Sequence, residues 1–180
     1  MNGLVQKLNK SKNDVIYTPL LVVKDMIEIC GIKPTDSVLD CSAGDNKIFY
    51  NNFPDCEKSY CEITDGINFF EETKHYDLII GNPPYSIWNK WLAKTIELTN
   101  KFCFIIGALN FTDARVRMLK EAGFGLTYFK ILNIEWYFSC SYLVVFEKDK
   151  QSIIDVGEKS VLCECGKRCK RKSNTCGLVV

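Results

Sequence analysis

The chain has 180 residues, of which 47% are hydrophobic and 25% are charged, and its formal net charge is +1. This composition indicates a soluble globular protein with one domain and room for a small appendage. No apolar run is long enough to cross a bilayer, and the first lysines are not followed by an apolar segment, so neither a membrane span nor a secretory signal is expected. We expect a cytoplasmic protein without membrane contact.

Charge is distributed unevenly along the chain. Residues 1–13 contain three lysines and no acid, residues 158–180 carry +4, and residues 14–157 therefore carry −6. A polyanion such as nucleic acid would bind the two basic ends, although solvated tails can have the same composition. We interpret 1–13 as a basic arm, 14–150 as the main domain and 158–180 as a small basic module, joined by a polar linker near 148–155.

The main domain predicts alternating helices and strands. The first helix follows Thr18, a candidate cap, and Pro19, which suits a first turn, and it ends at Gly31. Strands are expected at 38–40, 59–62, 76–80, 102–107, 126–134 and 142–146, and further helices from about 47, at 87–98 and at 112–122. The alternation predicts an α/β fold with a doubly wound, mostly parallel Rossmann-like sheet, whose last two strands form an antiparallel edge hairpin.

The segment Asn82-Pro83-Pro84-Tyr85 ends an apolar strand, because proline lacks an N–H and drives the preceding residue toward extended geometry. Ligands of open α/β sheets bind at this carboxyl end of the strands. The Asn82 amide oxygen and the Pro83 carbonyl could accept the hydrogens of a conjugated exocyclic amine, and Tyr85 could stack on its ring. The loop suits methyl transfer to such an amine, although Asn-Pro and Pro-Pro also form ordinary turns.

Other strand ends have features of a nucleotide-like site. The small residues at 41–44 let the backbone approach a ligand, and the absence of a Gly-x-Gly-x-x-Gly pattern favours one without phosphates, such as S-adenosylmethionine. Glu62 lies about 20 residues further on, where an acid commonly binds ribose hydroxyls. Asn68 and Phe69 could flank an adenine, although a phenylalanine here also fits core packing. The amino end of the first helix could hold a carboxylate.

Over about residues 15–147 the chain resembles the adenine-N6 DNA methyltransferases of the class I S-adenosylmethionine-dependent fold. The motifs that carry the resemblance are, in order, Tyr17-Thr18-Pro19, Val38-Leu39-Asp40-Cys41-Ser42-Ala43-Gly44-Asp45, Glu62, Asn68-Phe69-Phe70 and Asn82-Pro83-Pro84-Tyr85. The resemblance implies that Asn82 and the Pro83 carbonyl hold the target amino group, and that Tyr85 stacks on a base flipped out of the duplex.

The resemblance also implies a cofactor site. S-adenosylmethionine would contact Asp40, Ser42, Ala43 and Gly44 with its methionine part, assisted by Tyr17, Thr18 and Pro19, and would contact Glu62 with its ribose and Asn68 and Phe69 with its adenine. The chain departs from the family at Cys41, where Pro or Gly is usual, at Asn46, where Gly is usual, and at Asn68, where Asp is usual. No region after the hairpin is as large as the usual target-recognition region, so a homodimer or a separate specificity partner stays open.

Four cysteines lie close together near the end of the chain. They are Cys163, Cys165, Cys169 and Cys176. Four thiolates match a structural, tetrahedral zinc site, with free or redox-active thiols as the alternative. Lysines and arginines between these cysteines favour contact with nucleic acid. The other six cysteines stand mostly in apolar contexts, which is typical of small buried residues in a reducing compartment.

These patterns predict an S-adenosylmethionine-dependent N6-adenine methyltransferase that acts on DNA and carries one structural zinc. The single histidine, His75, lies in a polar segment, which disfavours Ser–His or Cys–His catalysis. Three alternatives stay open: methylation of adenine N6 in RNA, methylation of a glutamine side chain in a protein, and a non-catalytic nucleic-acid-binding subunit. The first two present the same kind of conjugated nitrogen to the Asn82 loop, so the loop alone does not separate them.

Overall fold

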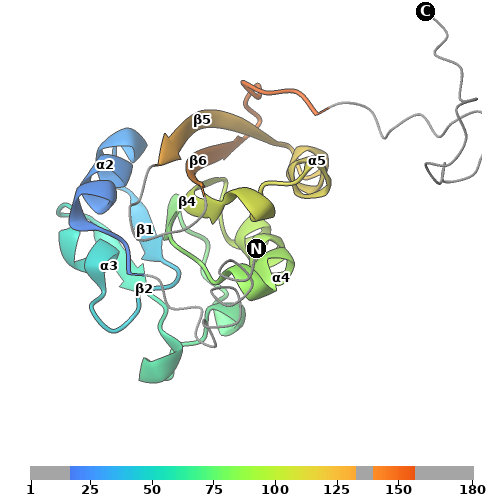
Figure 1. The fold of residues 1–180 in the computed structure, drawn as a ribbon. Coiled ribbons are helices and arrows are strands. Elements are labelled where there is room, and N and C mark those ends of the chain that lie inside the picture. Colours follow the sequence, from blue (N-terminus) through green and yellow to red (C-terminus); the bar gives the residue numbers. More distant parts are fainter. Residues whose placement is uncertain (1–16, 133–139, 157–180) are drawn as a thin grey trace, which may run out of the picture.

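The computed structural model describes residues 17–132 and 140–156 (Figure 1). The helices of this part are α2 (Leu20–Cys30), α3 (Ile48–Asn52), α4 (Trp88–Leu98) and α5 (Asp113–Glu121). The strands are β1 (Ser37–Asp40), β2 (Glu57–Tyr60), β3 (Leu78–Gly81), β4 (Lys101–Gly107), β5 (Phe124–Leu132) and β6 (Ser141–Lys148). The predicted basic arm 1–13 and the cysteine-rich module 158–180 lie outside the described residues, so the division into domains stays a prediction.

The described strands form one six-stranded mixed sheet in the order β2-β1-β3-β4-β6-β5. Strands β1 to β4 pair in parallel, whereas β6 runs antiparallel to both β4 and β5. The predicted α/β class with a mostly parallel sheet is therefore confirmed. The order was not foreseen, because β6 lies between β4 and β5 and leaves β5 alone at the edge.

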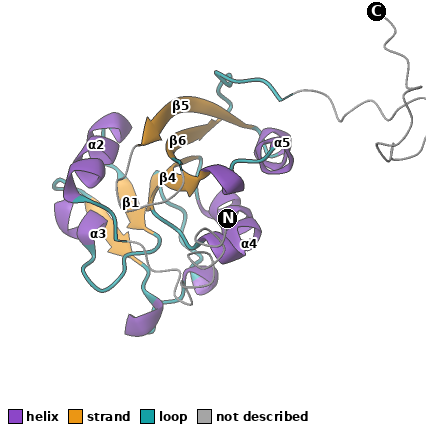
Figure 2. Ribbon diagram, in the orientation of Figure 1, coloured by secondary structure: helices purple, strands orange, loops and turns teal. Residues whose placement is uncertain are grey.

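Helices cover both faces of the sheet, with α2 and α3 on one face and α4 and α5 on the other (Figure 2). The strand side chains alternate between two apolar cores. Val38 and Ile80 face the core that contains α2 and α3, whereas Leu39 and Ile79 face the core that contains α4 and α5. This period of two is the pleat of a strand that is buried on both sides, which explains why the sequence shows continuous apolar runs.

Local signals place most element ends correctly. Helix α2 ends at Gly31, whose left-handed backbone (φ 60°) lets its N–H bond back to the last turn. The prediction that Thr18 caps this helix is wrong, because Pro19 is the N-cap and no side chain caps the helix. The helix expected at 87–98 begins one residue later, after a 3₁₀ turn at Tyr85–Ile87.

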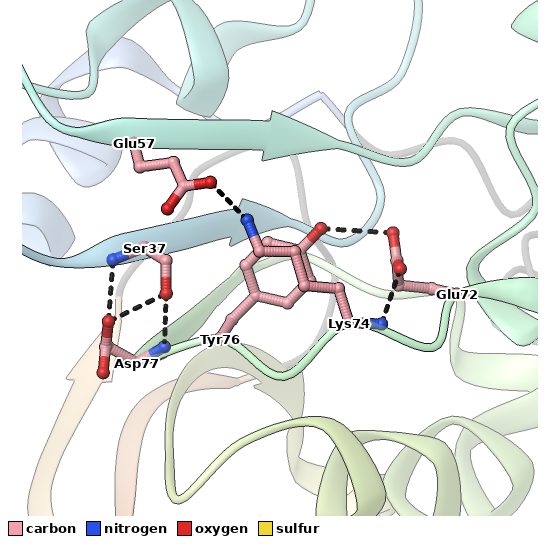
Figure 3. Close-up of polar contacts among 6 residues, drawn as sticks. All are labelled: Ser37, Glu57, Glu72, Lys74, Tyr76 and Asp77. Carbon is pink, nitrogen blue, oxygen red and sulfur yellow. Dashed lines mark hydrogen bonds and ion pairs between the residues drawn. The ribbon is translucent and has the colours of Figure 1, made fainter.

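The amino ends of the central strands are fixed by polar contacts (Figure 3). The Asp77 carboxylate accepts hydrogen bonds from the backbone N–H and the hydroxyl of Ser37, both at 2.8 Å, and these bonds lower the pKa of Asp77. Lys74 forms an ion pair with Glu57, which ties the segment before β3 to β2. These contacts are consistent with the register in which β1, β2 and β3 pair, with their carboxyl ends at the same edge of the sheet.

No helix in 17–132 or 140–156 is long and apolar enough to cross a membrane.

Candidate active site

A cavity of about 420 Å³ lies at the carboxyl ends of β1, β2 and β3. Four segments that are far apart in the sequence supply its walls: the residues before α2, the loop after β1, the segment after β2, and the loop and helix after β3. Its lining residues are Tyr17, Thr18, Cys41, Ser42, Ala43, Gly44, Asn46, Ile48, Phe49, Cys61, Glu62, Ile63, Ile67, Asn68, Phe69, Phe70, Asn82, Pro84, Ile87 and Trp91. The cavity size falls in the range of about 300–1,000 Å³ that is typical of small-molecule sites.

Asp40 holds the loop after β1 from below. Its carboxylate is fully buried and accepts hydrogen bonds from the backbone N–H groups of Ser42 (3.3 Å) and Tyr50 (3.2 Å). Burial raises the pKa of Asp40 to about 7 in spite of these bonds. Asp40 therefore joins the loop after β1 to α3. It does not line the cavity, so its position does not support the predicted direct contact with a cofactor.

Glu62 connects two walls of the cavity. One carboxylate oxygen accepts the backbone N–H of Gly44 at 2.8 Å, and the other accepts the N–H and the hydroxyl of Thr64 at 3.0 and 2.8 Å. Burial alone would raise the pKa of Glu62, but the hydrogen bonds from Thr64 and Gly44 outweigh it and lower the pKa. Gly44 adopts a left-handed backbone (φ 64°), which turns its N–H toward Glu62. An ionised acid thus lies in the wall.

Phe69 and Phe70 both line the cavity, but they differ in exposure. Phe69 is 3% exposed and belongs to the core, whereas Phe70 is 38% exposed at the cavity wall. The expectation that one of the two serves core packing therefore fits Phe69, although its position in the wall also allows a ligand contact. Asn68 caps the short turn that holds both rings, since its side-chain oxygen accepts the Phe70 N–H at 3.1 Å.

The Asn82 side chain forms hydrogen bonds with Thr18 and with Tyr85. Its amide nitrogen donates to the Thr18 hydroxyl at 3.4 Å, and its amide oxygen accepts the Tyr85 hydroxyl at 3.3 Å. Thr18 is buried and lies in the cavity wall, 64 residues before Asn82 in the sequence. Tyr85 packs edge-on against Trp88, with ring centroids 6.2 Å apart. The loop after β3 is thus held from both ends, with Asn82 in the wall.

Gly81 allows the loops after β1 and β3 to approach each other. A Cβ atom at this position would lie 3.0 Å from Ser42 Oγ and 3.1 Å from Cys41 Sγ, closer than side chains normally pack. The absence of a side chain at the end of β3 therefore lets the two loops pack tightly against each other.

Most of the site residues predicted from the sequence meet at this one cavity. Those in its wall are Tyr17, Thr18, Ser42, Ala43, Gly44, Glu62, Asn68, Phe69 and Asn82. Pro19 is instead the N-cap of α2, where its carbonyl accepts the N–H groups of Val22 and Val23. Pro83 and Tyr85 adjoin the site through Asn82, while Asp40 lies beneath it.

Sequence reasoning missed several lining residues, of which Trp91 and Cys61 are the clearest. Trp91 lies on helix α4 and is 7% exposed. Its position in the cavity wall depends on how α4 crosses the sheet, for which the sequence offered no signal. Burial raises the pKa of Cys61 to about 12 and also raises that of Cys41, so both thiols stay protonated and are poor nucleophiles.

Within the part of the chain that the structure describes, no group of three or more His, Cys, Asp or Glu side chains could hold a metal ion. The predicted zinc ligands Cys163, Cys165, Cys169 and Cys176 lie outside the described residues.

No model of a known protein family matches this sequence, and no curated protein matches it significantly. Solved structures do match. Magnesium protoporphyrin IX methyltransferase from Synechocystis PCC 6803, solved with bound S-adenosylmethionine, is 10% identical and has a TM-score of 0.58, with 81% of this chain and 91% of that chain covered. The 23S rRNA methyltransferase ErmE is 10% identical (TM-score 0.55, coverage 78% and 72%).

A third similar structure is the ribosomal protein L11 methylase from Lactobacillus delbrueckii subsp. bulgaricus, at 15% identity and a TM-score of 0.55, with 71% of this chain and 77% of that chain covered. By their names, the three proteins act on a small molecule, an RNA and a protein, so the shared fold leaves the substrate open. The chain has the Rossmann-like fold of the S-adenosylmethionine-dependent methyltransferases.

Proposed function

We propose that this protein is an S-adenosylmethionine-dependent methyltransferase that methylates the exocyclic N6 amine of adenine in DNA. The observation that carries the proposal is the position of Asn82, which lies in the wall of the cavity at the carboxyl ends of the parallel strands. The order of motifs from Tyr17 to Tyr85 favours DNA over the other substrates with a conjugated nitrogen. The basic ends 1–13 and 158–180 would contribute contacts with the polyanion.

The cavity suits S-adenosylmethionine by its chemistry. The ionised carboxylate of Glu62 can accept hydrogen bonds from ribose hydroxyls. Half-exposed apolar side chains from Ile67 and Phe70 offer contacts for a flat, weakly polar base. The protein would hold the methionine part at Ser42, Ala43 and Gly44, where small residues leave the backbone accessible. When bound, the cofactor supplies an electrophilic methyl group.

The chain's own contribution to the transfer would be orientation and charge stabilisation by Asn82. Its amide oxygen already accepts one hydrogen bond from Tyr85, which fixes the direction of that oxygen. A target amine placed there would donate to the same oxygen and to the Pro83 carbonyl, so its lone pair would be less delocalised into the ring. Positive charge that develops on the nitrogen would be stabilised by these two preorganised oxygens.

The experiment is transfer of labelled methyl groups from S-adenosylmethionine by the full chain to DNA, to total RNA and to protein extract, with separation of the modified nucleosides and amino acids. Label in N6-methyldeoxyadenosine is the expected result. Label only in RNA or only in a glutamine side chain would replace DNA by that substrate. A protein that binds no S-adenosylmethionine would exclude methyl transfer and leave a non-catalytic binding subunit.

Asn82→Ala tests the assigned residue. We expect turnover to fall by at least about 100-fold, which is typical of the loss of one preorganised transition-state contact, while the Kd of the cofactor stays within about threefold. Asn100→Ala is the matched control, since Asn100 is exposed just before the amino end of β4, at the opposite end of the parallel strands from the cavity. Unchanged turnover in Asn82→Ala would refute the mechanism while leaving the cofactor assignment intact.

A further inference from the structure

Trp91 contacts two walls of the cavity at once. Its indole N–H donates to the Cys41 thiol at 3.4 Å, and its ring stacks on Phe69 with centroids 4.5 Å apart and planes 18° apart. Phe70 meets the same indole edge-on at 5.2 Å. Cys41 belongs to the loop after β1, and Phe69 belongs to the turn after the β2 segment. One side chain therefore joins the two loops to which the methionine part and the adenine of the cofactor were assigned.

The hydrogen bond to Cys41 gives the buried Trp91 N–H an acceptor. The Trp91 side chain is almost fully buried, and a buried indole N–H without an acceptor would be destabilising. The Cys41 sulfur is the acceptor, and because burial raises the pKa of this thiol, the pair stays neutral. The Cys41 thiol also lies within 4.0 Å of the Ser42 hydroxyl, so the contact continues into the loop.

Trp91 also lies on the helix that follows the proposed catalytic loop. Helix α4 begins at Trp88, three residues after Tyr85, and Trp91 is one turn further along. A movement of the Cys41 loop or of the Phe69 turn would therefore shift the packing of helix α4, to which the Asn82 loop is attached.

We propose that Trp91 is a positioning residue for cofactor binding: it fixes the Cys41 loop through its N–H and braces Phe69 through its ring, so that both walls have their binding geometry before the ligand enters. This inference rests on the proposed function, because it assumes that the ligand of the cavity is S-adenosylmethionine. It assigns Cys41 a structural purpose, as the hydrogen-bond acceptor of Trp91, and no chemical step.

The test measures the Kd of S-adenosylmethionine by isothermal titration calorimetry for the wild-type chain and five variants. Trp91→Phe removes the indole N–H and keeps a ring, and Cys41→Ala removes the acceptor and keeps the stack. Each should weaken binding about fivefold, the equivalent of one net hydrogen bond. The double variant should also be about fivefold weaker, because both changes remove the same bond, whereas independent effects would multiply to about 25-fold.

Trp91→Leu removes the stack as well, and its binding should be at least about 10-fold weaker. The matched control is Trp88→Phe. Trp88 is buried on the same helix and packs against Phe104, but it does not line the cavity, so its variant should lose stability without losing cofactor affinity. Tryptophan emission provides a second readout: the change on binding should be smaller in Trp91→Phe than in the wild type and in Trp88→Phe, because Trp91 is the described tryptophan that lines the cavity.

The outcomes separate the two claims. A wild-type chain that binds no S-adenosylmethionine would overturn the proposed function and this inference with it. Wild-type binding with unchanged affinity in Trp91→Phe would overturn the inference alone, and so would multiplicative effects, because Cys41 would then act on the ligand directly. If Trp91→Leu fails to fold, Trp91→Phe, Cys41→Ala and their combination still decide the question.

Discussion

Asp40 makes the stability of this protein depend on pH in a direction opposite to that of most carboxylates. Its side chain is fully buried beneath the loop after β1, and its pKa is raised from 3.8 to about 7, mainly by burial. The folded state therefore holds this proton more tightly than the unfolded state does. Between about pH 4 and pH 7 the folded chain binds more protons, so the free energy of unfolding falls as the pH rises through this window.

The magnitude follows from the shift. A rise of about three pKa units corresponds to about 4 kcal/mol once the group is ionised in both states. Roughly 2–3 kcal/mol of this would be lost between pH 5 and pH 8, because part of the change occurs below pH 5. Asp40→Asn stays neutral throughout, so the variant should lack this loss. Its own cost is about one hydrogen bond, since one of the two backbone N–H groups that Asp40 accepts would face an amide nitrogen.

The assay is urea unfolding at pH 5, 6, 7 and 8 for the wild type, Asp40→Asn and Asp77→Asn. Asp77 is the control because its pKa is lowered by its hydrogen bonds to Ser37, so its contribution is lost only as the pH falls through the acid range and is constant above pH 5. The free energy of unfolding should fall equally steeply with pH in the wild type and in Asp77→Asn, and less steeply in Asp40→Asn. Equal slopes in all three proteins would refute the assignment of a buried, neutral Asp40.

Two further changes test the contacts around the Asn82 loop. Thr18→Val removes the hydroxyl that accepts the Asn82 amide N–H, and it should lower kcat about 10-fold with little change in fold stability. Thr18→Ser keeps the hydroxyl and should retain most activity. Equal kcat values in the two variants would contradict an orienting role for Thr18. Gly81→Ala places a Cβ 3.0 Å from Ser42 Oγ, so it should destabilise the fold by about 1–3 kcal/mol and weaken S-adenosylmethionine binding. Thermal unfolding measures the first effect and calorimetry the second. Wild-type stability and affinity in this variant would show that the loops after β1 and β3 have room to separate.

Several elements could be predicted because their signals are local. Helix α2 ends at Gly31, where only glycine adopts a left-handed backbone without cost. The β3 strand ends at Gly81, before two prolines that cannot continue a ladder. The continuous apolar run of β4 predicts a strand that is covered on both faces of the sheet, and β4 is buried in this way.

The order of the last two strands could not be predicted in the same way. The sequence analysis expected β5 and β6 to pair with each other as a hairpin, but it did not decide which of the two strands pairs with β4. The structure pairs β6 with β4 and leaves β5 at the edge. That choice depends on contacts between residues that are far apart in the chain, which no local pattern encodes.

The chain by itself determined which loops form the candidate site, because the carboxyl ends of parallel strands always meet at one edge of the sheet. It could therefore indicate the segments around Thr18, Gly44, Glu62 and Asn82. Only the tertiary structure decided which side chains of these segments face the cavity. The Asp40 carboxylate bonds to backbone N–H groups outside the cavity wall, whereas Trp91 extends from helix α4 into the wall. The pleat of a strand end and the crossing of a helix fix these side-chain directions.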